Sequence, residues 1–390
     1  MCKNDANIET TLHTKSSSTL KRISIFIAFL IGAFALAIPI LISELVGGWT
    51  RKYTSPVRFH PQRDIPNLSG KVAIVTGSNT GIGYHTALNL AMKGAHVIAA
   101  ARSEVRGKDA IAKMEQEMKD NKSMIQNGGK VTFLPLDLSS LDSVDRFASE
   151  FLSLQLPSLD ILVLNAGVMK SPGSDFVGQN LTYGFETTRD GFETHIGVNH
   201  IAHVHLTNLL LDKLKASAPS RIVSVSSMAE MGGYEEGFRF QDWRPTNGKP
   251  ESYEDGRAYG QSKLANLMWT EELAIRWNGT GVTAYSCHPG VIETELSRYM
   301  EKELESNNPL GILFGKVFSS GMFSAPDGAL TQLHLATAPE DSLMNGQFYH
   351  PIGRLTPPYH PLGKNANLRS VLWDETQRAI QLRKKYSYVK

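Results

Sequence analysis

Tyr259 and Lys263, four positions apart, are the residues of this sequence best suited to proton transfer. If the segment is helical, their side chains lie on the same face, although such a pair alone is more often a solvated helix face. The pKa of a free tyrosine is about 10, so it is a poor base near neutral pH. A cation about 4 Å away is worth roughly 4 kcal/mol at an effective dielectric constant near 20, or about three pKa units. We therefore expect Lys263 to bring the pKa of Tyr259 near neutrality, so that Tyr259 can exchange a proton with a substrate oxygen.

The segment at residues 76–83, TGSNTGIG, is rich in glycine and lies between an apolar run and a helical pattern. Glycine lets the backbone approach a phosphate, and a helix N-terminus supplies free N–H donors and positive potential. The spacing is G-x-x-x-G-x-G, not the commoner G-x-G-x-x-G. Such a loop is often an ordinary turn, but its place between strand and helix favours a dinucleotide site. The expected cofactor-binding residues here are Gly77, Ser78, Asn79, Thr80, Gly81, Ile82 and Gly83.

The ends of the following strands predict the rest of this site. Arg102 follows the second strand, and the first acidic residue after it is Glu104. An acidic residue would hold the ribose 2′-hydroxyl of NAD, whereas arginine suits the 2′-phosphate of NADP, so NADP(H) is favoured. The alternative for Arg102 is a solvated charge at a strand end. Asp137 follows the third strand, and Asn165, Ala166 and Gly167 follow the fourth. Sheets of this kind bind ligands at the carboxyl ends of their strands, so we expect these residues to contact the cofactor.

Short apolar runs alternate with helical patterns from residue 71 onward. The runs are rich in Val, Ile and Leu without polar alternation, which is typical of parallel strands buried on both faces. The expected strands are 71–76, 96–101, 131–136, 159–164, 221–226 and 282–287. The expected helices include 82–93, 103–121, 141–154, 257–277 and 325–337. This alternation predicts an α/β fold, a Rossmann-type doubly wound parallel sheet in one domain at 67–390.

Residues 23–43 contain no charged side chain, and as a helix they would span roughly 30 Å, about the thickness of a bilayer core. They predict a single transmembrane anchor at 23–46, after a tail at 1–22 and before a proline-containing linker at 47–66. A cleaved signal peptide is the alternative, because small residues at 33–37 resemble cleavage sites. Flanking Lys and Arg are balanced and leave orientation open. The small number of cysteines favours a location of the catalytic domain in a reducing compartment.

The composition narrows the function classes. The chain has 390 residues, is 41% hydrophobic and carries a net charge of +2, which argues against disorder and against a nucleic-acid partner. Two cysteines cannot form a disulfide framework or a cysteine-based zinc site. The histidines show no metal-ligand spacing, so we expect no metal site. Of these, His200, His203 and His205 are expected at packing positions.

Four motifs in this order resemble the short-chain dehydrogenase/reductase superfamily: TGxxxGxG at 76–83, NAG at 165–167, SS at 226–227 and YxxxK at 259–263. The segments SVSS at 224–227, YGQSKLAN at 259–266 and HPG at 288–290 are similar to its retinol dehydrogenase-like branch. The resemblance covers nearly all of 67–390. It implies an NADP-dependent oxidoreductase that interconverts a lipophilic alcohol (retinoid, steroid or fatty-type) and its aldehyde or ketone. The alternative is an NADP(H)-binding redox-sensing or scaffold protein at a membrane.

The resemblance also implies a catalytic set of Tyr259, Lys263, Ser227 and Asn199. Ser227 would hydrogen-bond the substrate oxygen, with Ser226 left open as an alternative. Asn199 matches the family's helix asparagine, which ties a proton-relay water to the lysine; otherwise it satisfies the helix backbone. Further cofactor contacts would come from Tyr259, Lys263, Pro289, Gly290 and Thr294. Thr80 occupies a position where many NADP-dependent members of the family have a basic residue. The prediction of NADP(H) as the cofactor therefore depends largely on Arg102.

Two further segments bear on the substrate and on partners. The 32 positions from Ser227 to Tyr259 include an insertion-like stretch, 230–255, with Phe238, Phe240 and Trp243. It would line the substrate mouth or form a surface flap. The apolar segment 309–323 would be a lid or a core helix. We expect membrane lipid contact, a possible homodimer, and a single-pass protein with a cytosolic catalytic domain, the endoplasmic reticulum being the favoured membrane.

Overall fold

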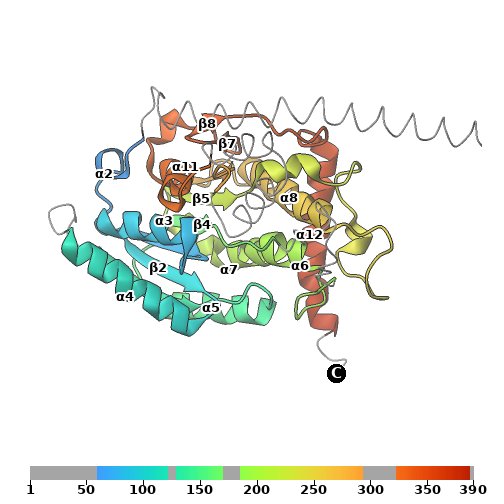
Figure 1. Ribbon diagram of the computed structural model, residues 1–390, viewed down its shortest axis with the longest axis horizontal. Coiled ribbons are helices and arrows are strands. Elements are labelled where there is room, and N and C mark those ends of the chain that lie inside the picture. Colours follow the sequence, from blue (N-terminus) through green and yellow to red (C-terminus); the bar gives the residue numbers. More distant parts are fainter. Residues whose placement is uncertain (1–58, 122–128, 170–184, 293–321, 387–390) are drawn as a thin grey trace, which may run out of the picture.

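The computed structural model describes residues 59–121, 129–169, 185–292 and 322–386 (Figure 1). Several sequence predictions lie outside these ranges: the tail at 1–22, the membrane span within 23–46, most of the linker at 47–66, Thr294, and all but the last two residues of segment 309–323. Within the described ranges, none of the helices is both long enough and apolar enough to cross a bilayer.

The described strands form one sheet in the order β3-β2-β1-β4-β5-β6-β7-β8. Neighbouring strands are parallel except for β8, which runs antiparallel to β7. The strands are β1 Val72–Thr76, β2 His96–Ala101, β3 Lys130–Pro135, β4 Ile161–Leu164, β5 Ser220–Val225, β6 Val282–Cys287, β7 Phe348–His350 and β8 Arg354–Leu355. The strand order reverses between β1 and β4, and ligands bind beside such a switch point at the carboxyl ends of the strands.

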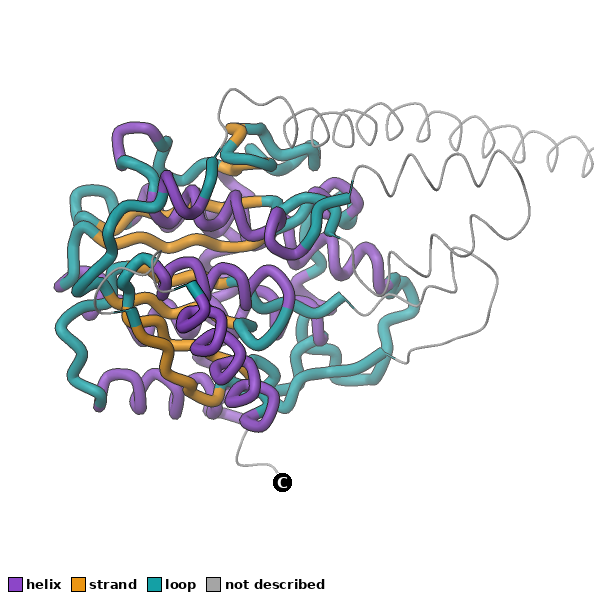
Figure 2. The backbone as a smooth tube through the Cα atoms, turned by 60° about the vertical axis from the view of Figure 1, so that its left-hand side comes forward, coloured by secondary structure: helices purple, strands orange, loops and turns teal. Residues whose placement is uncertain are grey.

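Helices cover both faces of the sheet (Figure 2). One face packs on α3 Gly81–Met92, α4 Glu104–Asp120 and α11 Ala325–Thr337. The other packs on α5 Leu141–Ser153, α7 Ala202–Ala216, α8 Asp255–Arg276 and α12 Ala366–Tyr386. Short elements complete the described chain: α2 Pro61–Asp64, α6 Thr194–Ile196, η2 Gly197–Ile201, η3 Met228–Gly232, η4 Phe240–Asp242 and η5 Glu340–Ser342. Strand β1 shows why the runs are continuously apolar, because Ile74 joins one core and Ala73 and Val75 join the other.

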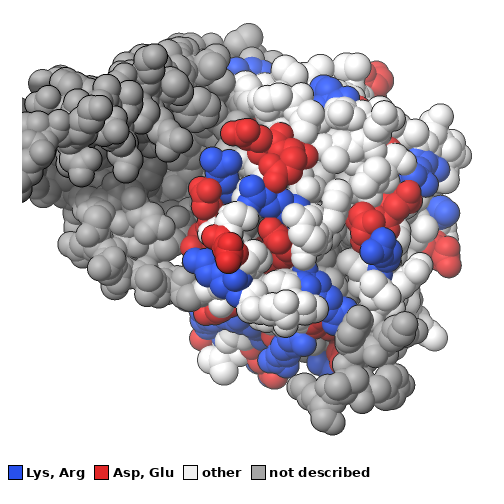
Figure 3. All heavy atoms as spheres, turned by 90° about the vertical axis from the view of Figure 1, so that its right-hand side faces the viewer, with Lys and Arg blue, Asp and Glu red and all other residues white. Residues whose placement is uncertain are grey.

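The predicted α/β fold with a Rossmann-type parallel sheet is confirmed. The six expected strands and five expected helices are present, with ends that differ by two residues at most. Strands β7 and β8 were not predicted, because segments of three and two residues are too short to show a periodicity. On the face drawn in Figure 3, acidic and basic side chains of the described residues lie intermixed, as the balanced composition predicts.

Candidate active site

Tyr259 and Lys263 lie one turn apart on α8, and their side chains meet as predicted. The Lys263 ammonium lies over the tyrosine ring, 5.6 Å from its centroid. Lys263 is 4% exposed and donates a hydrogen bond of 3.1 Å to the carbonyl oxygen of Val225, the last residue of β5. The lysine therefore connects α8 to the carboxyl end of the sheet and holds a cation beside the phenol.

The two serines after β5 have different surroundings. Ser226 is buried, and its hydroxyl donates to the carbonyl oxygen of Lys263 at 2.6 Å. The Ser227 hydroxyl accepts the N–H of Ala229 at 3.1 Å and hydrogen-bonds with the side chain of Tyr259. The geometry therefore favours Ser227 over Ser226 as the hydroxyl that shares a substrate oxygen with the tyrosine.

Asn199 lies in η2, a π-helical turn, and such turns are frequent at functional sites. Its amide oxygen accepts the N–H of Val168 at 2.8 Å, and its amide nitrogen donates to the carbonyl of Val168 and to the Ser262 hydroxyl, both at 3.0 Å. A Cβ at Gly167 would lie 3.3 Å from both Asn199 Oδ1 and Lys263 Nζ. Because Gly167 has no side chain, the side chains of Asn199 and Lys263 can both lie close to its backbone.

The expectation that Lys263 brings the pKa of Tyr259 near neutrality is wrong for this arrangement. Burial raises the pKa of Tyr259, and the hydrogen bond with Ser227 offsets only part of that rise. Burial also lowers the pKa of Lys263 to about 8. The spacing of the two residues predicts only the attraction between their charges, whereas desolvation penalises a phenolate and an ammonium alike. Tyr259 is therefore a protonated phenol at neutral pH, suited to donating a proton.

The glycine loop has the geometry of a phosphate cradle. Gly77 and Gly81 have φ of +68° and +59°, a region that favours glycine. A Cβ at Gly83 would lie 2.4 Å from both the carbonyl oxygen of Gly77 and the side-chain nitrogen of Asn165. The Thr80 side chain does not cap α3, and the first turn of α3 has no acidic residue. The N–H groups of that turn therefore face a region suited to an anion.

Thr76, at the end of β1, was not predicted as a site residue. Its hydroxyl accepts the N–H groups of Asn165 and Ala166 at 2.9 and 3.0 Å and lies 3.0 Å from Nε2 of His203. The side chain of Asn165 returns a hydrogen bond of 2.8 Å to the carbonyl oxygen of Thr76. Asn165 and Ala166 thus help fix the loop after β4 against the glycine loop. The position of a threonine directly before the glycine loop was the sequence feature that could have identified Thr76 as a site residue.

Arg102 lies beside the start of the glycine loop. The N–H of Gly77 donates to the carbonyl of Ala100 at 2.7 Å, which ties the loop to β2 two residues before Arg102. Arg102 is exposed at that strand end. Asp137, after β3, accepts the N–H and hydroxyl of Ser139 at 3.0 and 2.7 Å, so this carboxylate shapes its own turn.

The segment after β6 carries Pro289 and Gly290. Gly290 has φ of +101°, and a Cβ there would lie 2.7 Å from the ring of Phe323. Both residues follow the carboxyl end of β6, the strand next to β5, and so belong to the same edge of the sheet as Ser227.

The aromatic residues of the insertion-like stretch do not form a surface flap. Phe238 and Trp243 are 5% and 3% exposed, and Phe240 packs on the same core cluster. The ring of Trp243 lies edge-on to His200 at 6.1 Å between centroids. These aromatic side chains therefore hold the stretch on the core.

The histidines expected at packing positions are buried, as predicted. His200 lies 3.2 Å from Asn266 Oδ1 and 3.0 Å from the Thr376 hydroxyl, and His205 lies 2.7 Å from Asp145 Oδ1. Burial lowers the pKa of His200 to about 3 and that of His203 to about 4. These two histidines are therefore neutral hydrogen-bonding groups at neutral pH.

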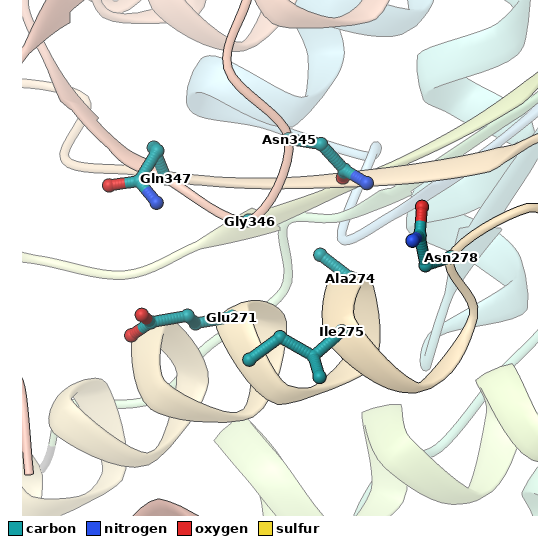
Figure 4. Close-up of a pocket in the computed structure, with 7 residues that line it drawn as sticks. All are labelled: Glu271, Ala274, Ile275, Asn278, Asn345, Gly346 and Gln347. Atoms are coloured by element: carbon teal, nitrogen blue, oxygen red, sulfur yellow. The ribbon is translucent and has the colours of Figure 1, made fainter. Parts of the chain in front are cut away.

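A hollow of about 300 Å³ lies at the other end of α8 from Tyr259 (Figure 4). It is lined by Glu271, Ala274, Ile275, Asn278, Asn345, Gly346 and Gln347. About 12 residues separate Glu271 from Tyr259 on the helix, a rise of roughly 18 Å. This hollow is therefore separate from the candidate active site.

Glu230, three residues after Ser227, is a buried carboxylate that the sequence did not single out. Its oxygens accept the backbone N–H groups of Tyr359 and His360 at 2.6 and 3.0 Å. Burial raises its pKa to about 7, although those two hydrogen bonds oppose the rise. Glu230 thus joins the turn after β5 to the segment before α12, and its charge is unfavourable in the folded state.

We expect Glu230→Gln to remove a pH-dependent destabilisation. A carboxyl whose pKa rises on folding stabilises the protein below its unfolded pKa, and this contribution is lost as pH rises through the folded pKa. The free energy of unfolding of the native chain, minus that of the variant, should therefore fall by about 2–3 kcal/mol from pH 5 to pH 8. Urea unfolding at several pH values measures this difference. A difference independent of pH would contradict the assigned titration.

The chain is similar to several known proteins. Residues 71–239 match the family described as short chain dehydrogenase. Retinol dehydrogenase 12 of Mus musculus is 40% identical over 288 residues, 74% of this chain and 80% of that protein. Retinol dehydrogenase 13 of Homo sapiens is 38% identical over 317 residues, 81% of this chain and 86% of that protein.

Two solved structures share the fold. An uncharacterized protein from Mycobacterium Paratuberculosis is 30% identical with a TM-score of 0.59, over 82% of this chain and 97% of the other. L-Sorbose reductase from Gluconobacter frateurii, complexed with NADPH and L-sorbose, has a TM-score of 0.54 over 75% of this chain and 98% of the other. The latter is 22% identical, so it supports the fold alone.

Proposed function

Because the chain belongs to the short-chain dehydrogenase/reductase family, we propose that it is an NADP-dependent oxidoreductase acting on a lipophilic alcohol or its aldehyde or ketone. The observation that carries this proposal is the convergence of Tyr259, Lys263 and Ser227 at the carboxyl end of β5. The substrate class is supported by the relatives, several of which are named retinol dehydrogenases.

The residues of the glycine loop fit a dinucleotide. The turn at Gly77 and the missing Cβ at Gly83 bring backbone close to where a phosphate would lie, and the first turn of α3 supplies N–H donors. Arg102 would hold the 2′-phosphate of NADP(H) through charge-assisted hydrogen bonds. The loop after β4, and Pro289 and Gly290 after β6, would complete the cofactor site.

NADP(H), when bound, supplies the hydride donor or acceptor of the nicotinamide. For carbonyl reduction, Tyr259 donates the proton of its phenol to the substrate oxygen, consistent with its raised pKa. The Ser227 hydroxyl donates a hydrogen bond to the same oxygen and orients it. The Lys263 ammonium stabilises the tyrosinate formed by this transfer, and Asn199 positions the backbone around Gly167 beside that ammonium.

Turnover of a substrate panel tests this function. The full-length chain in detergent is assayed with NADPH and NADH in parallel, against retinaldehyde, a steroid ketone and a long-chain fatty aldehyde. We expect NADPH-dependent reduction of at least one of them. Tight NADPH binding without turnover of any lipophilic carbonyl would instead indicate a redox-sensing or scaffold protein.

We expect Arg102→Glu to remove the preference for NADPH. Loss of a charged hydrogen bond to the 2′-phosphate costs about 1.5–3 kcal/mol, so NADPH affinity should fall about 10- to 100-fold. NADH affinity should change less, because NADH has no 2′-phosphate. Fluorescence titration measures both affinities. Lys113→Glu, which makes the same charge change at an exposed position of α4, is the control. Equal losses for NADPH and NADH would contradict the role of Arg102.

We further propose that residues 23–46 anchor the catalytic domain, 67–390, to a membrane through the linker at 47–66. The uncharged run at 23–43 and the lipophilic substrate class support this arrangement. We propose that this anchor crosses the membrane of the endoplasmic reticulum once and leaves the catalytic domain in the cytosol. We also propose that the protein forms a homodimer. Alkaline carbonate extraction should leave the full chain in the membrane pellet, whereas release into the supernatant would exclude the anchor. Crosslinking in detergent tests the dimer.

A further inference from the structure

A buried carboxylate is separated from Tyr259 by one side chain, that of His195, and has no part in the mechanism above. Glu193 is 2% exposed and precedes α6. Its carboxylate accepts the backbone N–H groups of His195 and Ile196 at 3.0 and 2.9 Å. These hydrogen bonds and the neighbouring imidazole hold the pKa of Glu193 below its usual value, although burial opposes them. Glu193 is therefore a charged hydrogen-bond acceptor inside the protein at neutral pH.

The same carboxylate holds two side chains. Nδ1 of His195 lies 2.7 Å from Glu193 Oε1, and the Tyr253 hydroxyl donates to that oxygen at 2.9 Å. A carboxylate facing Nδ1 keeps a proton on that nitrogen, which fixes the orientation of the imidazole. Burial raises the pKa of Tyr253, so its hydroxyl stays protonated and remains a donor.

His195 transmits this restraint to the active site. Its ring is 1% exposed and packs edge-on against Tyr259, with 6.0 Å between ring centroids and an interplanar angle of 72°. The tyrosine is thus restrained by the imidazole, by the ammonium of Lys263 and by the hydrogen bond with Ser227.

Glu193 also fixes the stretch 230–255. Its N–H donates to the carbonyl of Trp243 at 2.9 Å, and Tyr253 is near the end of that stretch. One residue therefore contacts both the insertion-like stretch and the histidine that packs on Tyr259. Two side chains, those of Glu193 and His195, therefore connect the stretch to Tyr259.

We infer that Glu193 is a positioning residue, which sets the orientation of Tyr259 through His195 and couples it to the stretch 230–255 through Tyr253 and Trp243. This inference rests on the proposed function in taking Tyr259 as the proton donor. Misplacement of a reacting group by about 1 Å can cost about 100-fold in rate, so even a small rotation of the phenol matters.

Glu193→Gln tests the inference with the volume of the side chain retained. The amide keeps one oxygen for His195 and Tyr253 but has no negative charge, and its NH2 group would replace the oxygen that accepts the N–H of Ile196. The anchor for the His195 imidazole is therefore weakened. We expect kcat to fall by about 10- to 100-fold, with NADPH affinity within about twofold of the native value. Tyr253→Phe removes one donor only and should give a smaller fall in kcat. This milder variant keeps the inference testable if Glu193→Gln does not fold.

Asp160→Asn is the matched control. Asp160 is also buried, at 6% exposed, accepts the N–H of Val72 at 2.8 Å and pairs with Lys71, but it lies at the amino end of β4, away from the active site. It should lower the free energy of unfolding and leave kcat within about twofold of the native value. Equal falls in kcat for both variants would show a merely structural role for Glu193.

A readout independent of turnover separates this inference from the proposed function. In protein labelled with ¹³C at the tyrosine ζ carbon, the Tyr259 resonance is assigned by its loss in Tyr259→Phe. We expect this resonance to shift in Glu193→Gln and in Tyr253→Phe, but not in Asp160→Asn. An unmoved resonance in folded Glu193→Gln would overturn the inference. Absence of turnover in the native chain would overturn the proposed function and leave this measurement valid.

Discussion

Replacing Tyr259 with phenylalanine is expected to lower turnover by about 1,000-fold or more. The variant keeps the ring that packs on His195 and Lys263 but lacks the hydroxyl that donates the proton. Positioned general acid–base groups contribute about 100- to 10,000-fold to rates, and this hydroxyl is also hydrogen-bonded to Ser227. NADPH affinity should stay within about twofold of the native value, since this contact is a small part of the dinucleotide site. Steady-state kinetics and fluorescence titration measure the two quantities.

Tyr285→Phe is a matched control for that experiment. Tyr285 is fully buried on β6, and its hydroxyl has no hydrogen-bond partner among the described residues. Removing a buried unsatisfied hydroxyl should leave the free energy of unfolding unchanged or higher, and turnover should stay at the native level. Preserved turnover in Tyr259→Phe would contradict the proposed mechanism.

Gly83→Ala is expected to weaken both cofactor binding and the stability of the fold. The new methyl group would lie 2.4 Å from the carbonyl oxygen of Gly77 and from Asn165 Nδ2, so the backbone of the loop must move. Overpacking of this kind costs about 1–3 kcal/mol in stability. Losing one hydrogen bond to a charged phosphate costs about 1.5–3 kcal/mol, so NADPH affinity should fall about 10- to 100-fold. Chemical unfolding and fluorescence titration measure the two effects.

Gly256→Ala is the control for Gly83→Ala. Gly256 lies in the first turn of α8, where no atom outside its own helix lies within 4 Å of a new Cβ. Alanine favours helix over glycine by up to about 1 kcal/mol, so this variant should be as stable as the native chain or more stable. Unchanged NADPH affinity in Gly83→Ala would show that the loop does not bind the cofactor as proposed.

The parts of the fold that follow from local pattern were predictable from the sequence. Buried parallel strands must be apolar on both faces, which is why β1 and β6 were found within one residue of their ends. The spacing of Tyr259 and Lys263 was sufficient to place both side chains together, since it depends only on helix geometry.

What depends on tertiary environment was not predictable. The pKa of Tyr259 rises because of its burial, which no spacing rule encodes. Asn199 lies in a π-helical turn, and its contact with Ser262 joins positions 63 residues apart. Glu193 and Glu230 also contact segments that are remote in sequence, Glu193 through Tyr253 and Glu230 through Tyr359.

Transfer of deuterium from cofactor to substrate is the most direct measurement of the proposed function. The full-length chain is incubated with retinaldehyde and with NADPH deuterated at the transferable position of the nicotinamide, and the product is analysed by mass spectrometry. We predict an alcohol that carries one deuterium in the native reaction, and none above background with Tyr259→Phe. Tight NADPH binding without deuterium in any product, across retinoid, steroid and fatty carbonyls, would contradict the assignment as an oxidoreductase of this substrate class.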